Sequence, residues 1–267
     1  MHARETHAAP WQATAAYLYL LWLDAVSLAW EYLRRDPAYR ACWCRFGRGD
    51  AADAARPWGL QRLEDPLLDA RRAHPLWDNR LPALLHVHAA DGLAEEAAGA
   101  TLDLWHMPGE KRLAALPAGF VLLVRDGPDC LRLRLGPGVL EGRPALCAVP
   151  LDARLRAQAA VLAAHAAGLA PGCRAHAARR AAQGAVRAVS PTSMSHLRAL
   201  QALDGALAGA SQRRIAEVLY GRERVRGQWH ADSALRAQLR HSLARGMALM
   251  RGGYRELAGL RQNRPGA

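Results

Sequence analysis

Arginine side chains with the spacing needed to contact a polyanion gather in the stretch from Gly209 to Met250. Taking about 100° per residue, the segment from Ser233 to Met250 predicts an amphipathic helix with leucines and methionines on one side and arginines over the rest. Alanines separate these arginines, so the polar face could approach a groove closely. Guanidinium groups there could donate charge-assisted hydrogen bonds to phosphates and to guanine edges. The alternative is an arginine-rich face that is merely solvated, which spacing alone does not exclude.

Two shorter helices are expected before this one. Ser211 is a suitable N-cap, and apolar residues at helical spacing follow it until Gly221 ends the helix. Leucines spaced three or four apart, from Leu197 to Leu207, predict a helix before that one. The C-terminal unit is therefore trihelical, its helices begin near Ser193, Ser211 and Ser233, and it is typical of a helix-turn-helix-like domain.

The connection between the last two helices is long for such a motif. Eleven residues, from Gly221 to Ala231, lie where a standard turn has about three or four. The connection is either a tethered loop that adds phosphate contacts or a wing-like excursion over the core, and it contains Arg222, Arg224, Arg226 and Trp229.

Side chains from two helices are expected to bind DNA. Those that begin the second helix would hold phosphates with help from the helix N-terminus, and those of the third helix would enter the groove. The candidate DNA-binding residues are Ser211, Gln212, Arg213, Arg214, Arg236, Arg240, His241 and Arg245.

The charge of the chain is unevenly distributed. The formal net charge of the 267 residues is +12, yet residues 1–100 contain 11 arginines against 13 acids, and residues 190–267 contain 13 arginines against five. A near-neutral front and a basic end suit a polyanionic partner that meets the C-terminal part of the chain. With 51% hydrophobic residues, the chain can also bury a sizeable core.

Motifs for catalysis or for metal binding are not found in the sequence. It contains no glycine-rich phosphate loop with a lysine, no nucleophile elbow and no His-Glu-x-x-His helix. Five cysteines, an odd number, are mostly isolated, which argues against a disulfide framework and suggests a reducing compartment. Cys42 and Cys44 could join His86 and His88 around zinc only by an unsupported folding assumption. We therefore expect no enzyme activity, no cofactor and no metal.

The front of the chain, residues 1–95, is expected to be a tryptophan-rich helical domain. Seven of the eight tryptophans lie in the first 105 residues, either as an aromatic core or as a contact surface. Helical spacing from Tyr17 to Leu33 ends at Asp36-Pro37. The apolar run from Ala15 to Trp30 is interrupted by Asp24 and is too short to span a bilayer, so a cytoplasmic, soluble protein without a membrane partner is expected.

The middle of the chain, residues 100–189, is expected to combine a small antiparallel sheet with alanine-rich helices. Short apolar or alternating runs between turn residues predict strands at 102–105, 120–125, 131–135 and 145–151, and Leu81–His88 is a strand or a short helix. Arg132 and Arg134 alternate with leucines, which predicts solvated side chains on the exposed face of the sheet, with contact to DNA as the alternative. A helix runs from Asp152 to about Gly168 and stops at Pro171-Gly172. With a third domain at 190–260, the fold class is α+β and mostly helical.

Several blocks of the sequence resemble a known family. Residues 196–256, with the block from Gly209 to Gly221 and with Met250-Arg-Gly-Gly-Tyr-Arg-Glu256, resemble bacterial transcription regulators that carry a RovC-type DNA-binding domain, formerly a domain of unknown function. Trp30-Glu-Tyr-Leu-Arg-Arg-Asp-Pro-Ala-Tyr39 is similar to the transcriptional regulator-like domain that often precedes it. The resemblance implies sequence-specific promoter binding, transcription activation and a homo-oligomer, in the form of a ring.

Two functions are consistent with these observations. In the first, the chain is a transcription activator: residues 190–260 bind double-stranded DNA, and the sheet and the front support assembly or contact with RNA polymerase. In the second, it is a non-enzymatic adaptor whose basic helix docks on an acidic protein partner. DNA binding and partner capture by an Arg240→Ala variant distinguish the two.

Overall fold

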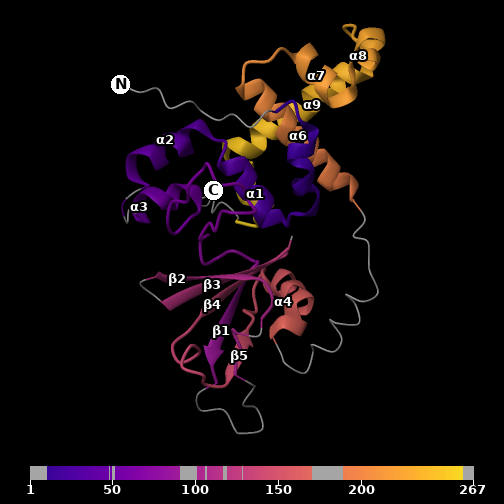
Figure 1. Ribbon diagram of the computed structural model, residues 1–267. Coiled ribbons are helices and arrows are strands. Elements are labelled where there is room, and N and C mark those ends of the chain that lie inside the picture. Colours follow the sequence, from indigo (N-terminus) through magenta and orange to yellow (C-terminus); the bar gives the residue numbers. More distant parts are fainter. Residues whose placement is uncertain are drawn as a thin grey trace.

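The computed structural model has two layers, and the N-terminal and C-terminal helices lie together in one of them (Figure 1). It describes residues 11–47, 49, 52–90, 101–105, 107–116, 119–127, 129–169 and 189–260. The N-terminal helices, coloured indigo in Figure 1, lie beside the orange and yellow C-terminal helices, while the sheet and one helix form the other layer. The predicted fold class, a mostly helical α+β protein with a sheet in the middle of the chain, is confirmed.

Short helices form the front of the chain. Asp24 caps α1 by accepting a hydrogen bond from the Ser27 N–H at 2.6 Å. Asp36-Pro37 ends the preceding helical segment as predicted and also starts the next one, because Asp36 caps it and Pro37 is its first residue. The elements are the 3₁₀ helix η1 (Thr14–Trp22), α1 (Ala25–Leu33), α2 (Pro37–Phe46), α3 (Ala52–Ala55) and the 3₁₀ helix η2 (Arg56–Trp58).

The sheet is mixed rather than antiparallel throughout. Its strands follow the order β2-β3-β4-β1-β5 and are β1 (Leu84–Ala89), β2 (Glu110–Leu116), β3 (Gly119–Asp126), β4 (Asp129–Leu135) and β5 (Ala145–Ala148). The predicted hairpin of β3 and β4 is present. The antiparallel prediction is wrong at β1, which inserts beside β4 in parallel orientation. The segment that the sequence left open between strand and helix is therefore a strand.

The prediction of a strand at Leu102–Trp105 is also wrong. Only Thr101 pairs there, through an isolated bridge to Pro144. Leu102 and Leu104 pack as half-buried side chains against the core of the sheet, so their apolar pattern reflects packing without strand pairing. Glu110–Leu116 forms the edge strand instead.

Arg132 is a buried member of β4, contrary to the prediction that it is solvated. Its side chain is 6% exposed and donates hydrogen bonds to Asp24 Oδ2 at 2.8 Å and to Ser27 Oγ at 3.2 Å. Burial alone would raise the pKa of Asp24, but the Arg132 guanidinium holds it below its usual value. Because α1 covers this face of the sheet, the buried arginine needs the paired carboxylate.

Helix α4 (Leu155–Leu169) lies in the same layer as the sheet, as Figure 1 shows, and confirms the predicted alanine-rich helix. Its Val161 and Leu162 pack against the apolar core formed by the strands. Gln158 is fully buried and donates a hydrogen bond from Nε2 to the Leu84 carbonyl at 2.9 Å. The predicted stop at Pro171-Gly172 lies outside the described residues.

The C-terminal part of the chain is helical, and most of its predicted start signals are used. Ser190, and not Ser193, caps the first of its helices by accepting the Ser193 N–H at 3.0 Å, and Pro191 is the first helical residue. A π-helical turn with Gly252 at φ 125° separates the last two helices. The elements are α6 (Pro191–Leu207), α7 (Gln212–Tyr220), α8 (Arg222–Gln228), α9 (Ala234–Ala248), η5 (Leu249–Gly253) and α10 (Tyr254–Leu257).

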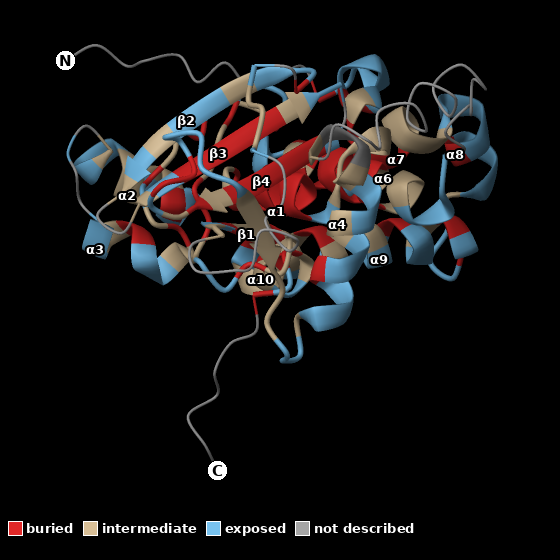
Figure 2. Ribbon diagram, turned by 90° about the horizontal axis from the view of Figure 1, so that it is seen from below, coloured by how far each residue is buried: buried red, intermediate tan, exposed pale blue. Residues whose placement is uncertain are grey.

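One apolar core joins the two ends of the chain. It contains Trp30 from α1 together with Leu200 from α6 and Tyr254 from α10. Figure 2 shows that burial is greatest in α1 and in β3 and β4, whereas α2, α3 and α8 carry much of the exposed surface. Of the front tryptophans, Trp30 is fully buried and Trp105 is 91% exposed, so the aromatic residues are core in some places and surface in others.

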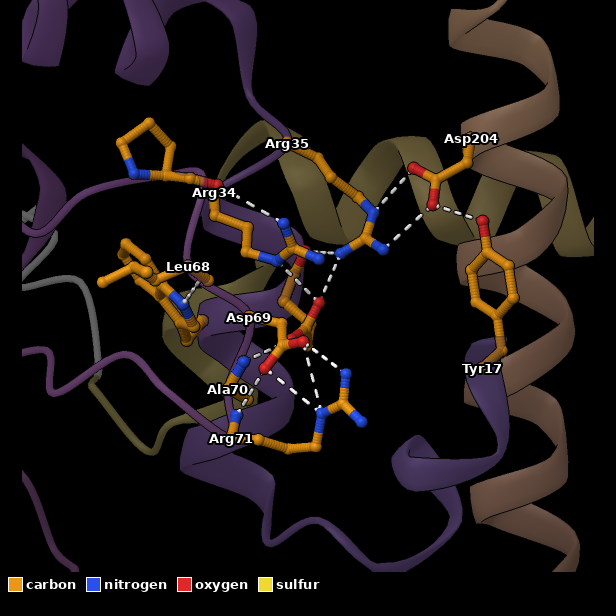
Figure 3. A network of polar contacts seen from close by, with 11 residues as sticks. Tyr17, Arg34, Arg35, Leu68, Asp69, Ala70, Arg71 and Asp204 are labelled. Atoms are coloured by element: carbon orange, nitrogen blue, oxygen red, sulfur yellow. Dashed lines mark hydrogen bonds and ion pairs between the residues drawn. The ribbon is translucent and has the colours of Figure 1, made fainter. Parts of the chain in front are cut away.

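A buried polar network ties the front to α6 (Figure 3). Glu31 on α1 accepts hydrogen bonds from Arg35 at 2.6 Å and from the Ala70 N–H at 2.6 Å. Arg35 also donates to both carboxylate oxygens of Asp204 on α6, at 2.7 and 2.9 Å, and the Tyr17 hydroxyl donates to the same carboxylate at 2.6 Å. Every charge in this chain of contacts is paired, which lets the groups remain ionised inside the protein.

Candidate nucleic-acid interface

Helix α7 begins where the sequence predicted. Ser211 has an extended backbone, and its Oγ accepts the Arg214 N–H at 3.2 Å, so it is the N-cap. Ile215 is buried on the inner side of the helix, while Gln212 and Arg213 are exposed at its N-terminus. Two of the predicted DNA-contacting side chains therefore stand at the positive end of the helix dipole.

The two arginines of α7 share one carboxylate. Arg214 Nη1 lies 3.3 Å from Glu217 Oε2, and Arg213 Nε lies 3.7 Å from Glu217 Oε1. Their side chains are 37% and 58% exposed, so solvent weakens both pairs. The start of α7 thus carries about one uncompensated positive charge in addition to the helix dipole.

The connection after Gly221 is neither a loop nor a wing. Gly221 adopts φ 92°, which glycine tolerates without strain, and the chain turns directly into α8. Val225 anchors α8 because it is fully buried in the same apolar cluster as α7 and α9. Three arginines of α8 are exposed, namely Arg222, Arg224 and Arg226, and Arg226 pairs with Glu223 at 2.9 Å.

Helix α9 presents a flat outer face. Ser233 caps it by accepting the Arg236 N–H at 3.2 Å, and Leu235 and Leu239 are buried as predicted. Arg240 and His241 are exposed, among the exposed alanines Ala237, Ala244 and Ala248. Because alanine projects little beyond the backbone, the two longer side chains stand clear of this face.

Arg236 and Arg245 occupy the two borders of this face and are partly buried. The Arg236 Nε atom is buried and has no hydrogen-bond partner among the described residues. Arg245 points at α6, where it donates to Ser195 Oγ at 3.0 Å and to His196 Nε2 at 3.2 Å. The structure therefore groups Arg240 and His241 on open surface and engages Arg245 inside the protein.

His196 links Arg245 to the front of the chain. It is 3% exposed, and its Nδ1 lies 3.0 Å from the Tyr32 hydroxyl of α1. Burial and the neighbouring Arg245 guanidinium lower the pKa of His196 to about 4, so the ring is neutral at pH 7. Ser195 and His196 are neighbours in sequence, and in the structure both side chains accept hydrogen bonds from Arg245.

Two further cations lie near this surface: Arg198, which is not among the candidate DNA-binding residues, and Arg224, which the sequence offers only as part of the connection after Gly221. Arg198 of α6 and Arg224 of α8 both lower the pKa of Tyr220, which burial raises, so the two guanidiniums lie near that hydroxyl. The spacing of Leu197, Leu200 and Leu203 already implied that Arg198 points outward. For Arg224, the missing signal was that residues 222–228 form a helix.

The described residues contain neither a cluster suited to a metal ion nor a helix suited to spanning a membrane. No cluster of three or more His, Cys, Asp or Glu side chains there is arranged to hold a metal ion. Likewise, none of the helices in the described part of the chain is long and apolar enough to cross a bilayer.

Comparison with protein families identifies domains at both ends of the chain. Residues 148–259 match the family described as "T6SS, Transcription factor, DNA binding domain". Residues 10–61 match the family described as "Proteobacterial transcriptional regulator-like domain". No curated protein matches the chain. The two matches confirm the resemblance predicted from the sequence and are those of a transcriptional regulator with a DNA-binding domain.

Proposed function

We propose that this chain, which combines a regulator-like domain with a transcription-factor DNA-binding domain, binds double-stranded promoter DNA through α7, α8 and α9 and activates transcription. The observation that carries the proposal is that the exposed arginines lie inside the region that matches a DNA-binding domain. The match to a DNA-binding domain covers residues 148–259, and the exposed arginines of α7, α8 and α9 gather within it. Figure 1 shows α7 and α8 projecting at the end of the molecule that is far from the sheet.

The geometry suggests different roles for the exposed side chains. Arg240 stands on the alanine face of α9, which can approach bases closely, so we assign it to base edges in the major groove. Arg213, Arg222 and Arg224 lie at helix starts or on α8 and are suited to phosphates. Gln212 can add a phosphate contact beside the free N–H groups of α7.

The other predicted residues have roles set by their surroundings. Arg245 is bonded to α6, and we assign it to holding α9 in position. Arg236 remains a candidate for DNA because its side chain is only partly buried, at the border of the alanine face. Ser211 acts as a cap that keeps the start of α7 in place, and His241 is free to contact the backbone of the DNA.

Activation and a homo-oligomer rest on the family resemblance, and contact with RNA polymerase would be made by the sheet and the front of the chain. The second candidate, an adaptor that docks on an acidic protein, uses the same basic surface and is distinguished by experiment.

The test is a selection of bound fragments from genomic DNA by the full-length chain. We expect a set of fragments with a shared sequence to be enriched, and Arg240→Ala to lose that enrichment while retaining weaker, nonspecific binding. Arg56→Ala is a matched control, since it also removes one exposed arginine, 77% exposed, but from the front. Absence of enrichment, or equal loss by both variants, would contradict the proposal and favour the adaptor.

A further inference from the structure

A cavity of about 490 Å³ opens between residues 62–76 and the edge strand β2. Its volume falls within the range of about 300–1,000 Å³ that is usual for small-molecule sites. It lies outside α7, α8 and α9, so it is separate from the surface proposed to bind DNA.

Arginines from both sides of the cavity line its wall. Arg62, Arg71 and Arg72 come from the segment after η2, and Arg112 comes from β2. The acidic lining residues are Glu64 and Glu110. The lining therefore carries more positive than negative charge, and guanidinium groups pair bidentately with carboxylate or phosphate oxygens.

These arginines differ in how far they are already engaged. Arg71 is fixed, because it pairs with Asp69 at 2.6 Å and its guanidinium lies 4.3 Å from the centre of the Tyr19 ring. Arg112 pairs with Glu110 at 3.1 Å, and both side chains are more than half exposed, so this pair can exchange partners. Arg72 is exposed and makes no ion pair or side-chain hydrogen bond with any other described residue.

His74 gives the cavity an uncommitted polar atom. Its side chain is 13% exposed, and its buried Nε2 has no hydrogen-bond partner in the described part of the chain, while Glu110 Oε1 lies 4.0 Å from it. Burial is the main cause that lowers the pKa of His74, and the nearby Arg112 and Arg125 guanidiniums lower it further, so positive charges lie close to this ring. An anion entering the cavity would offset these positive charges and favour a proton on Nε2, which could then donate a hydrogen bond to the anion.

We propose that this cavity binds a small anionic molecule bearing carboxylate or phosphate groups, with Arg72 and Arg112 as its main contacts and His74 in the wall. The bound anion would lie beside the segment whose Ala70 N–H donates to Glu31, the residue that begins the buried network to α6 in Figure 3. The site is therefore next to a connection with the DNA-binding end of the chain.

Isothermal titration of the full-length chain with citrate and with inorganic pyrophosphate, at constant ionic strength, tests the proposal. We expect one saturable site per chain, no heat with glycerol, and at least tenfold weaker binding for Arg72→Ala/Arg112→Ala. Far-UV circular dichroism checks that this variant is folded, and its two substitutions lie at exposed positions.

Two further variants separate this site from other basic surfaces. Arg222→Ala/Arg240→Ala should bind the anion as the wild type does, even where it loses DNA. Arg56→Ala/Arg80→Ala controls for the loss of two exposed charges elsewhere. The proposal is overturned by the absence of saturable binding for both anions at millimolar concentration, or by binding that is lost in Arg222→Ala/Arg240→Ala and kept in Arg72→Ala/Arg112→Ala.

Discussion

The stability of the fold should depend on pH through the contact between His196 and Arg245. A guanidinium can only donate, so Nε2 of His196 must accept, and the ring carries its proton on Nδ1, facing Tyr32. Protonating the folded ring would remove the acceptor and place two cations side by side. Both effects disfavour the charged ring, and burial together with Arg245 therefore lowers the pKa of His196 to about 4.

The sign and size of the effect follow from this depressed pKa. As pH falls below 6.5, the ordinary value, the unfolded chain binds the proton first, so folding stability decreases until about pH 4. At about 1.4 kcal/mol per pKa unit, the limit is about 3.4 kcal/mol, and about 2 kcal/mol is lost between pH 7 and pH 5. Asp24, Glu31 and Asp204 have pKa values below their usual range because arginines pair with them, so they lose their stabilising effect only at lower pH.

Urea unfolding at pH 7, 6 and 5 measures this loss in the wild type and in His196→Gln. The glutamine oxygen can still accept from Arg245, but the side chain does not titrate. Other histidines with lowered pKa, namely His74, His86 and His165, are present in both proteins, so their contribution cancels. We expect the wild type to lose about 2 kcal/mol more than the variant between pH 7 and pH 5. Equal losses would refute the role of the contact.

Two further predictions concern packing. Arg132→Met leaves the Asp24 carboxylate without its partner and should lower the free energy of unfolding in urea by about 3–5 kcal/mol. A second change, Asp24→Asn, should restore part of this loss. A loss under about 1 kcal/mol would show that the pair is not buried. Gly246→Ala would place a Cβ 2.9 Å from the Ala199 carbonyl oxygen and should destabilise the contact of α9 with α6 by about 1–3 kcal/mol. Its control, Gly227→Ala, meets no atom within 4 Å and should stabilise by about 0.5–1 kcal/mol, so equal effects of the two changes would contradict the packing.

Local signals in the sequence located the helices α1, α4, α6, α7 and α9. Ser211 and Ser233 each cap the helix predicted to follow them, since a serine oxygen beside the first free N–H groups acts over a few residues only. The hairpin of β3 and β4 was predictable for the same reason, because its turn and its alternation lie within a short stretch.

Contacts between distant segments could not be read in the same way. Arg132 has the alternating neighbours of a solvated strand residue, and only the position of α1 against β4 makes it buried. The parallel pairing of β1 with β4 joins residues far apart in sequence, which the pattern of either strand does not encode. The hydrogen bonds of Arg245 to α6 likewise depend on how two helices cross, which charge spacing does not report.

The sequence predicts where the candidate site lies better than it predicts which helices and residues form it. Charge asymmetry and amphipathic spacing indicated the C-terminal helices, but Gly221 followed by an arginine-rich stretch was interpreted as a connection. A short helix with few apolar residues has a weak pattern, and Val225, its buried anchor, is a single residue.

The salt dependence of DNA binding tests the central claim most directly. If the surface of α7, α8 and α9 neutralises about five phosphates, log affinity should fall with log salt at a slope of about −4 to −5. Arg222→Ala/Arg224→Ala should reduce the magnitude of that slope by about 2, and Arg56→Ala/Arg80→Ala should leave it unchanged. A slope near zero in the wild type, or the same slope in all three proteins, would contradict the account.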